Sequence, residues 1–321
     1  MKILISGITG QDGYHLSKML LDEGHSVHGI VRRNSQKTYG ALEYDRELIN
    51  KLEFYYGDVT DKSSLDLIFK TVKPDMVFHL AAQSFVQESW SNPEVTYDVN
   101  IKGTLNMLNS FREYTPEARF YNACSSEVYG KVSDDIQNEE SRMWPRSPYG
   151  ISKLAAMWTC INYRESYNLF VSNGILFNHE SPFRGVEFVT RKISLAAARI
   201  KLGLQDELKL GNMDAMRDWG YAGDYVRAMY MMLQANEPDD FVVATGESHS
   251  VQDFVEAAFG YLDLDYKQYV STDPKYLRPA EVQYLRGDAS KAKEKLGWKP
   301  SITFKGLVEL MVKTDLERLS D

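Results

Sequence analysis

Two residues four positions apart, Tyr149 and Lys153, have the side chains and the spacing for acid–base chemistry. On a helix, residues at positions i and i+4 lie on the same face. A free tyrosine has a pKa near ~10, and an ammonium group one turn away favours the phenolate and is expected to lower the pKa of Tyr149. Such a pair can move a proton to or from a sugar hydroxyl while a hydride moves elsewhere. From the spacing alone, an ordinary surface pair is the alternative.

A second polar group precedes this pair, in the stretch Ala123-Cys-Ser-Ser-Glu-Val-Tyr-Gly130. The apolar run 119–123 predicts a strand that carries Ser125, Ser126 and Glu127 at its carboxyl end, where open parallel sheets place their ligands. Taken alone, Glu127 is typical of a buried structural or an exposed carboxylate. Beside Ser125 and the Tyr149–Lys153 pair, we interpret it as a catalytic acid–base group.

A glycine-rich turn opens the chain. The strand 2–6 is followed by Gly7-Ile-Thr-Gly-Gln-Asp-Gly13 and by a helical pattern over 14–23. Glycines permit a tight turn and a close backbone approach, and the helix N-terminus then faces a pyrophosphate. A plain strand–helix turn is the alternative. We expect a dinucleotide to contact the turn through Gly7, Thr9, Gly10, Gln11, Asp12 and Gly13.

The end of the second predicted strand, 26–31, indicates which dinucleotide binds. Folds specific for NAD usually place a carboxylate there, on the ribose 2′-hydroxyl. This chain has Arg32, Arg33, Asn34 and Ser35 instead. Guanidinium groups suit a 2′-phosphate, which a carboxylate would repel. We therefore expect NADP; a solvated basic turn is the alternative.

The remaining pattern alternates strands with helices, which predicts an α/β fold with a doubly wound parallel sheet. Strands are expected at 52–56, 75–80 and 170–176, helices at 100–114 and 149–167, and a polar loop or helix at 36–51. Further cofactor contacts are expected from residues after the third and fourth strands, namely Asp58, Val59, Leu80, Ala81, Ala82, Gln83 and Ser84.

The character of the chain changes after Leu176, where polar, aromatic and basic residues dominate. A helix is expected at 193–202 and a strand at 241–245. We expect a smaller, discontinuous α/β substrate-binding domain beside the cofactor domain. The cofactor domain is predicted at 1–182, with returning segments at about 221–250 and 282–290. The substrate-binding domain is predicted within 183–321, at about 183–220, 251–281 and 291–321.

Composition excludes some classes of protein. With 321 residues and a net charge of −8, the chain lacks the basic surface that general nucleic-acid binding needs. Two cysteines indicate no disulfide framework and fit a reducing cytoplasm. Residues 3–5 form part of a predicted strand, so we expect no signal peptide, and no apolar run is long enough to span a membrane. We expect no metal site.

Several longer motifs go beyond a general cofactor fold: Val27-His-Gly-Ile-Val-Arg-Arg33, Pro145-Arg-Ser-Pro-Tyr-Gly150, Asn173-Gly-Ile-Leu-Phe-Asn-His-Glu-Ser-Pro182, Phe188-Val-Thr-Arg-Lys-Ile193, Arg217-Asp-Trp219 and Trp298-Lys-Pro300. Together with the glycine turn they resemble the extended short-chain dehydrogenase/reductase family, and most closely its GDP-mannose 4,6-dehydratases. The resemblance runs from Gly7 to about Asp315.

The resemblance implies a hydro-lyase with an internal redox cycle. A hydride leaves C4 of the sugar for NADP+, water is lost across C5 and C6, and the hydride returns to C6. It implies that Tyr149 is the base at O4, that Lys153 holds the nicotinamide ribose, and that Glu127 takes the C5 proton and gives it to the departing water. It also implies cofactor contacts by His179 and Arg184, and GDP-sugar contacts by Ser84, Glu127, Asn178, Lys192, Arg217, Arg278 and Glu281. A homodimer or homotetramer is expected, whereas Arg191 and Arg227 are interpreted as structural or solvated charges.

Two positions depart from the family pattern, which has Thr where this chain has Ser125 and often has Tyr where it has Val95. The hydroxyl of Ser125 is kept, but its χ1 is less restricted.

One alternative function is that of a dehydratase acting on GDP-manno-heptose or GDP-N-acetylglucosamine. Another is a nucleotide-sugar epimerase or 4-keto reductase, which does not need Glu127. A third is an NADP-sensing protein without turnover.

Overall fold

A seven-stranded parallel sheet forms the centre of the computed structural model, which describes residues 1–33, 35, 38–132, 135–276, 280, 282 and 284–320. Its spatial order is β11-β6-β5-β4-β1-β2-β3. The order reverses beside β1, as in other doubly wound sheets, and the register pairs Ile3 of β1 with Val27 on one side and Met76 on the other. The strands are β1 (Lys2–Ser6), β2 (Ser26–Val31), β3 (Glu53–Tyr56), β4 (Met76–His79), β5 (Arg119–Ser125), β6 (Phe170–Leu176) and β11 (Asp240–Val243).

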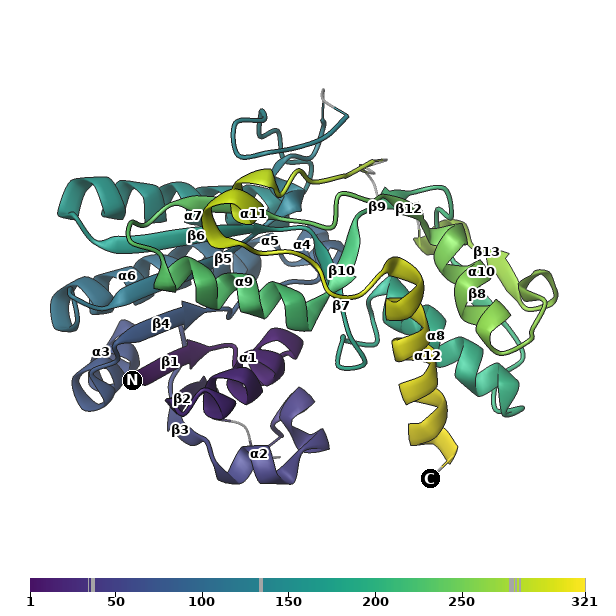
Figure 1. Cartoon of the computed structure of the whole chain (residues 1–321), viewed down its shortest axis with the longest axis horizontal. Coiled ribbons are helices and arrows are strands. Elements are labelled where there is room, and N and C mark those ends of the chain that lie inside the picture. The colour runs from purple at the N-terminus through teal and green to yellow at the C-terminus, as the bar shows by residue number, and fades with distance from the viewer. Residues whose placement is uncertain are drawn as a thin grey trace.

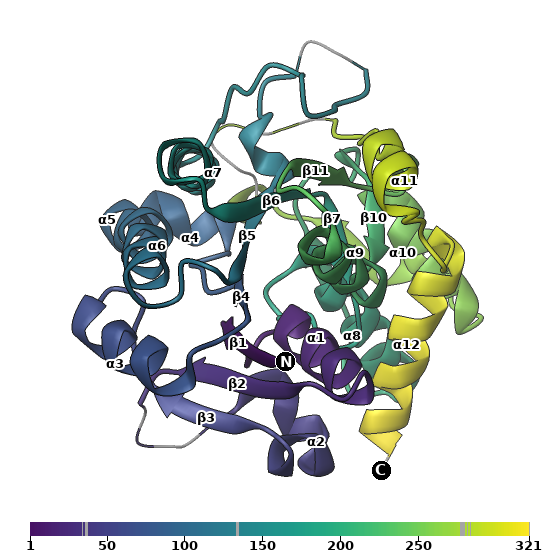
Figure 2. The same cartoon turned by 60° about the vertical axis from the view of Figure 1, so that its left-hand side comes forward.

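Helices cover both faces of this sheet (Figures 1 and 2). Successive residues of a strand point to opposite faces, so Ile3 and Ile5 of β1 join one apolar cluster and Leu4 joins another. The cluster that contains Ile3 includes α1 (Gln11–Asp22), α2 (Arg46–Asn50), α9 (Ala222–Gln234) and α11 (Ser290–Leu296), and the cluster that contains Leu4 includes α3 (Lys62–Val72), α6 (Gly103–Tyr114) and α7 (Pro148–Tyr167). The predicted α/β fold with a doubly wound parallel sheet is confirmed.

The predicted helix at 100–114 begins earlier than expected. The chain becomes helical at α5 (Pro93–Tyr97), continues through a π-helical turn (Asp98–Lys102) and passes into α6. Pro93 occupies the first turn of α5, where a missing backbone N–H costs nothing. A short helix, α4 (Val86–Ser91), comes just before it. The polar segment 36–51 contains a 3₁₀ turn (Gly40–Tyr44) and then α2.

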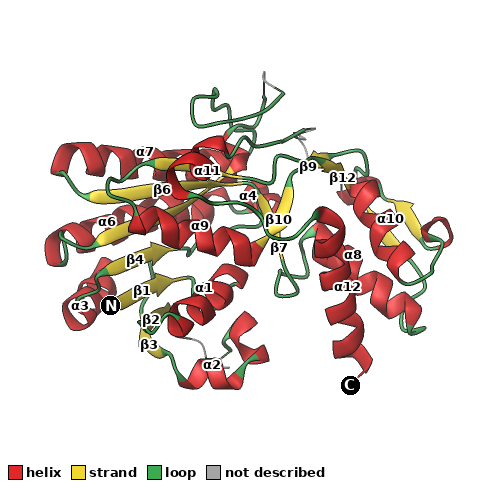
Figure 3. Ribbon diagram, viewed as in Figure 1, coloured by secondary structure: helices red, strands yellow, loops and turns green. Residues whose placement is uncertain are grey.

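A separate set of buried apolar residues, the second apolar cluster, lies beyond the sheet and its covering helices, on the right of Figure 3. Its three helices are α8 (Val189–Lys201), α10 (Val251–Tyr261) and α12 (Phe304–Ser320), packed around buried residues such as Trp219, Phe254 and Met311. Short strand pairs connect its segments: β7 (Asn178–Glu180) with β10 (Trp219–Tyr221), β9 (Met216–Arg217) with β12 (His249–Ser250), and β8 (Leu208–Leu210) with β13 (Val270–Thr272). The predicted division into domains stays a prediction; α11 packs against α9 and β11 of the sheet.

Buried charges join distant segments around the second cluster. Asp218 is fully buried and accepts hydrogen bonds from the backbone of Thr245, Gly246 and Gly287 at 2.8, 2.9 and 3.3 Å. Arg191 of α8 is buried and forms an ion pair with Asp315 of α12, so its charge is structural rather than solvated. Arg227 is more exposed and lies 3.1 Å from Asp224. Within the described residues, no helix combines the length and the apolar character that crossing a membrane requires.

Two helical glycines provide a matched test of the turn that starts the fold. A Cβ on Gly13 of α1 would lie 2.2 Å from the carbonyl oxygen of Ile8, whereas a Cβ on Gly260 of α10 would meet nothing within 4 Å. We expect Gly13→Ala to lower the free energy of unfolding by about 3 kcal/mol or to prevent folding, because α1 must move away from the turn. We expect Gly260→Ala to raise it by about 0.5 kcal/mol, through the better helix propensity of alanine. Urea unfolding of both variants measures the difference, and a Gly13→Ala protein as stable as wild type would contradict the close approach.

Candidate active site

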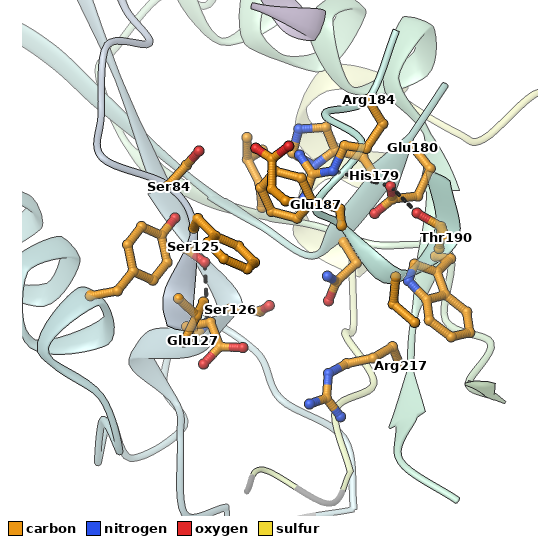
Figure 4. A pocket seen from close by; sticks show the side chains of 18 of the residues that line it. Ser84, Ser125, Ser126, Glu127, His179, Glu180, Arg184, Glu187, Thr190 and Arg217 are labelled. Carbon is orange, nitrogen blue, oxygen red and sulfur yellow. Dashed lines mark hydrogen bonds and ion pairs between the residues drawn. The ribbon is translucent and has the colours of Figure 1, made fainter. Parts of the chain in front are cut away.

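A cavity of about 390 Å³ lies at the carboxyl edge of the sheet, between the sheet and the second apolar cluster. It is lined by the turn after β1, the ends of β4 and β5, the first turns of α7, the segment 176–192 and residues from 210 to 219. Figure 4 shows polar side chains entering it from several of these elements. Parallel strands therefore bring residues that are distant in sequence to one place.

The glycine turn reaches the cavity with its backbone exposed. Gly7 has φ +75°, and a Cβ there would lie 2.7 Å from the backbone nitrogen of Ala81. Gly10 caps α1 without a side-chain hydrogen bond, so the first N–H groups of this helix remain available to an anion. Gly7, Gly10, Gln11, Asp12 and Gly13 line the cavity. Thr9 belongs to the turn but does not line the cavity, and its carbonyl accepts a hydrogen bond from Ala41 at 2.9 Å.

The residues expected to contact the adenosine part of the cofactor do not line the cavity. Arg32 and Arg33 are exposed directly after β2, and Ser35 is exposed too, whereas Asn34 lies outside the described residues. Asp58 and Val59 follow β3, and the Asp58 carboxylate accepts a hydrogen bond from the Thr60 nitrogen at 2.9 Å. Of the five expected residues after β4, Leu80, Ala82 and Ser84 line the cavity, while Ala81 and Gln83 do not.

Ser125, Glu127, Tyr149 and Lys153 all line the cavity. Ser125 accepts a hydrogen bond from the Glu127 backbone at 3.3 Å, which begins a 3₁₀ turn (Ser126–Val128) directly after β5. Ser147 accepts a hydrogen bond from Gly150 at 3.0 Å and thereby starts α7 just before Tyr149. Two caps therefore set the directions of the expected base and carboxylate.

The expected lowering of the Tyr149 pKa by Lys153 is wrong. Burial raises the pKa of Tyr149 above its ordinary value, and the opposing influences come from Ser125 and Arg184. The Lys153 ammonium lies 6.0 Å from the centre of the Tyr149 ring and donates a hydrogen bond to the Ala123 carbonyl at 2.8 Å. Burial also lowers the pKa of Lys153. Desolvation disfavours both the Tyr149 phenolate and the Lys153 ammonium. The spacing of the two residues in the sequence does not reveal how deeply they are buried.

A hydrogen-bond network behind the cavity was not foreseen. Asn100 accepts a hydrogen bond from Gln83 at 2.9 Å and donates to the Ser152 hydroxyl at 2.9 Å, and Ser152 donates to the Tyr149 carbonyl at 2.7 Å. Asn100 is buried in the π-helical turn before α6. A polar residue inside an apolar helical pattern was the available signal. The network ties the loop after β4 to the first turn of α7.

The segment after β6 forms two ion pairs at the cavity. His179 lies 2.9 Å from Asp12, and Arg184 lies 3.1 Å from Glu180. Glu180 is buried and also accepts a hydrogen bond from Thr190 at 2.6 Å. The Arg184 guanidinium lies 3.7 Å from the centre of the Phe188 ring. Figure 4 shows Arg184, Glu180 and Thr190 on one side of the cavity, across from Ser125 and Glu127.

Of the residues expected to hold the substrate, Asn178, Lys192 and Arg217 line the cavity together with Ser84 and Glu127. The Lys192 ammonium is 3.8 Å from the centre of the Tyr276 ring and donates to the Lys209 carbonyl at 2.6 Å. Arg278 and Glu281 lie outside the described residues. Residues to which the sequence assigned no role also line the cavity, namely Ser126, Glu180, Glu187, Thr190, Asn212, Trp219, Lys275 and Tyr276. No group of three or more metal-ligating side chains occurs among the residues described.

Comparison with known proteins covers nearly the whole chain. The model of the family described as GDP-mannose 4,6 dehydratase matches residues 4–311. GDP-mannose 4,6 dehydratase 2 of Arabidopsis thaliana is 51% identical over 98% of this chain and 86% of its own length. The human GDP-mannose 4,6 dehydratase is 47% identical over 98% of this chain and 91% of its own length. Among solved structures, RMD from Pseudomonas aeruginosa complexed with NADPH is 25% identical, covers 99% of both chains and has a TM-score of 0.82.

The protonation of Tyr149 can be measured directly. Because burial raises the pKa of Tyr149, we expect its phenol to stay neutral up to at least about pH 10, the ordinary value. The measurement is the ultraviolet phenolate absorbance of wild type minus that of Tyr149→Phe as the pH is raised. Tyr167→Phe, at the exposed end of the same helix, controls for the loss of one accessible phenol. A Tyr149 signal with a midpoint near neutral pH would overturn the dominance of burial.

Proposed function

Because the chain belongs to the GDP-mannose 4,6-dehydratase family, we propose that it is a hydro-lyase that converts GDP-mannose to GDP-4-keto-6-deoxymannose. The observation that carries this proposal is the Glu127 carboxylate lining the same cavity as Ser125, Tyr149 and Lys153. An epimerase or a 4-keto reductase of the same fold needs the tyrosine and the lysine but does not need Glu127 as a base at C5. A carboxylate beside them is the group that water elimination requires.

The cofactor is NADP. The uncapped N-terminus of α1 and the side-chain-free surface of Gly7 and Gly10 fit a pyrophosphate, and Arg32 and Arg33 after β2 fit a 2′-phosphate. When bound, NADP supplies the hydride acceptor for C4 and the hydride donor for C6. We assign the other expected residues around the glycine turn, after β3 and β4, and at His179 and Arg184 to the same cofactor.

In its phenolate form, Tyr149 takes the proton of the O4 hydroxyl. Burial raises the pKa of Tyr149, and the free energy needed to form its phenolate is partly offset by a hydrogen bond with Ser125 and by the charge of Arg184. The Ser125 hydroxyl, held at the end of β5, donates a hydrogen bond toward O4 as a threonine would. The catalytic roles of these side chains follow from their shared cavity and from the family pattern.

Glu127 acts twice in the reaction. It first removes the C5 proton, which the neighbouring ketone makes acidic, and it then gives that proton to the departing C6 hydroxyl. When the hydride returns to C6, C5 takes a proton from the solvent, and the O4 proton taken by Tyr149 returns to the solvent. One carboxylate suffices because the proton gained in the first step is the proton given in the second. The 3₁₀ turn after β5 keeps Glu127 about nine-tenths buried, which limits exchange of that proton with water.

The GDP-sugar occupies the second half of the cavity. Lys192 and Arg217 supply positive charge for the diphosphate, and Asn178 and Ser84 supply hydrogen bonds. Arg278 and Glu281 are assigned to the nucleotide by the family pattern alone. We assign the cofactor to residues 1–182 with their returning segments and the GDP-sugar mainly to 183–321.

The protein is proposed to act in the cytoplasm as a homo-oligomer. Cys124 and Cys160 are buried and unpaired, which suits a reducing compartment. Ile151 and Trp158 lie seven residues apart on α7 and are 45% and 59% exposed. Leu105 of the neighbouring α6 is also exposed. A dimer would bury this apolar face.

Turnover of GDP-mannose in deuterated water tests the reaction. We expect loss of one water from the sugar, one solvent deuteron at C5, and no net reduction of NADP, as followed by mass spectrometry and NMR. A panel that includes the GDP-heptose and the GDP-N-acetylhexosamine defines the sugar. GDP-mannose returned unchanged, or returned only as an epimer, would overturn the proposal.

The same turnover assay tests the role of the Glu127 carboxylate. Glu127→Gln should lower kcat by about 10²–10⁴-fold, because no other group then moves the C5 proton, while NADP still binds. Glu117→Gln, an exposed residue just before the opposite end of β5, is the control and should keep wild-type turnover. Undiminished water loss by Glu127→Gln would remove Glu127 from the mechanism.

Light scattering tests the oligomer. Wild type should have a mass of two or four chains, and Trp158→Glu should shift it toward one chain by placing a charge in the apolar face. Leu67→Glu, at a 66% exposed apolar position of α3, is the control and should leave the mass unchanged. A single-chain mass for wild type at working concentration would exclude the oligomer.

A further inference from the structure

A carboxylate lies where the cofactor phosphates are proposed to bind. Asp12 is in the first turn of α1, between the cavity-lining residues Gln11 and Gly13, and it lines the cavity itself. The N-terminus of a helix attracts anions. An uncompensated carboxylate at this place would both repel a pyrophosphate and compete with it for the helix N-terminus. The site therefore needs a positively charged group that pairs with the Asp12 carboxylate.

His179 supplies that charge, and its hydrogen bonds define its protonation. Nε2 of His179 lies 2.9 Å from Oδ2 of Asp12, and Nδ1 lies 2.8 Å from the carbonyl oxygen of Phe177. A carbonyl oxygen and a carboxylate only accept hydrogen bonds, so both ring nitrogens must donate. Only the doubly protonated, cationic imidazole carries both protons. The geometry thus describes an ion pair with no net charge beneath the phosphate site.

The pair is part of a rigid attachment between α1 and β7. The His179 ring stacks on Tyr225 of α9, with the ring centres 4.7 Å apart and the planes 21° apart. Gln11 donates to the His179 carbonyl at 3.0 Å and accepts from Ser181 at 2.8 Å. Two neighbouring residues of the first turn of α1 therefore hold β7. Asn178, which is assigned to the substrate, is the residue directly before His179.

We propose that Asp12 and His179 form a positioning pair that joins the glycine turn to β7 and that favours the anionic cofactor only while His179 carries both protons. The proposal rests on NADP binding at the glycine turn. Binding of the cofactor is then linked to protonation of His179, so that each favours the other. Loss of that proton leaves the Asp12 carboxylate uncompensated next to the pyrophosphate and weakens binding.

The groups facing the pair support this protonation state at neutral pH. Burial lowers the pKa of His179, but the charge and hydrogen bond of Asp12 outweigh burial and leave it raised, against the opposing charge of Arg184. Burial raises the pKa of Asp12, but His179 and Arg184 leave it lowered. The Arg184 charge is itself paired with Glu180 of β7.

The other titratable groups around the Asp12–His179 pair are neutral or act only weakly on its charge. Burial lowers the pKa of His15 of α1 to about 4, so its ring is neutral above that pH. Burial raises the pKa of Tyr225 of α9 and of Tyr121 of β5 well above ordinary values, so both stay neutral. The Asp12 charge also acts on Lys153 of α7 and favours its charged form. Asp12 is thus the principal negative group at His179.

The sign of the pH dependence follows from these directions. A raised pKa of His179 means that the ion pair is complete below the ordinary histidine value near ~6.5 and is lost as pH rises through the raised value. A lowered pKa of Asp12 means that the pair persists down to acid pH and is lost as pH falls through that lowered value. Cofactor affinity should therefore fall on the alkaline side.

The test is the dissociation constant of NADPH for cofactor-free protein, measured by fluorescence from neutral to alkaline pH at constant ionic strength. For wild type we expect the constant to rise by up to about tenfold per pH unit above the pKa of His179, the limit for one linked proton. Asp12→Asn should flatten this rise. His179→Gln should bind more weakly than wild type near neutral pH and should lack the rise.

Rescue distinguishes charge compensation from a loss of structure. The double variant Asp12→Asn with His179→Gln should bind NADPH more tightly than His179→Gln alone, because the uncompensated carboxylate is gone. His25→Gln, whose ring contacts Tyr230 on another part of α9, is the control and should keep the wild-type pH profile. Equal slopes for wild type and Asp12→Asn, or wild-type affinity of His179→Gln, would overturn the proposal.

If His179→Gln does not fold, the NMR titration of the His179 ring decides instead. Its midpoint should lie above that of a free histidine in wild type and should fall in Asp12→Asn; an unchanged midpoint would overturn the proposal. None of these measurements uses a GDP-sugar. A protein with the expected NADPH profile but no dehydration would therefore disprove only the proposed function. A dehydratase with pH-independent NADPH affinity would disprove only the pair.

Discussion

The constraint on which the site depends is a backbone contact that leaves no room for a side chain. The turn after β1 packs so closely that a Cβ on Gly13 would reach the Ile8 carbonyl, and a Cβ on Gly7 would reach the backbone after β4. This contact brings the N-terminus of α1 onto the carboxyl edge of the sheet. It also brings Gln11 and Asp12 to β7. Both the anion site and its attachment to the substrate side thus originate in one turn.

A chain of buried hydrogen bonds extends this positioning to the catalytic tyrosine. Ser6 of β1 bonds His79 of β4 at 2.7 Å, and His79 bonds Thr104 of α6 at 3.0 Å. Thr104 donates to the Asn100 carbonyl at 2.7 Å, and the Asn100 side chain continues to Ser152 and the first turn of α7. Burial lowers the pKa of His79 to about 3, so its ring is a neutral link. Satisfied buried networks of this kind specify one arrangement, because each missing bond would leave a costly unpaired polar group.

The fold could be predicted from the sequence because its signals are local. Apolar strands, the glycine turn and the helix caps are each encoded within a few residues, so the parallel sheet followed from their order. The start of the α5–α6 helical region was missed, since Pro93 reads as a breaker although it begins a helix. The lining residues Glu180, Thr190 and Tyr276 were missed for another reason. They enter the cavity through packing of the second apolar cluster, which no local pattern encodes.

Electrostatics was the least predictable part, because the charge of a buried group depends on tertiary neighbours. The spacing of Tyr149 and Lys153 suggested direct coupling, but burial governs both groups. The partners of the Asp12–His179 pair are 167 positions apart, so no sequence window contains them both.

Buried ion pairs add little stability compared with apolar packing, yet removing one partner is costly. Their presence at the cavity is therefore better explained by the charge balance there. Asp12 and Glu180 are each paired with a cation within the protein, whereas Lys192, among the described residues, contacts a carbonyl and an aromatic ring, which carry no net charge. Such an arrangement keeps the positive charge of Lys192 for a ligand phosphate, while the negative charges of Asp12 and Glu180 are balanced by their partners.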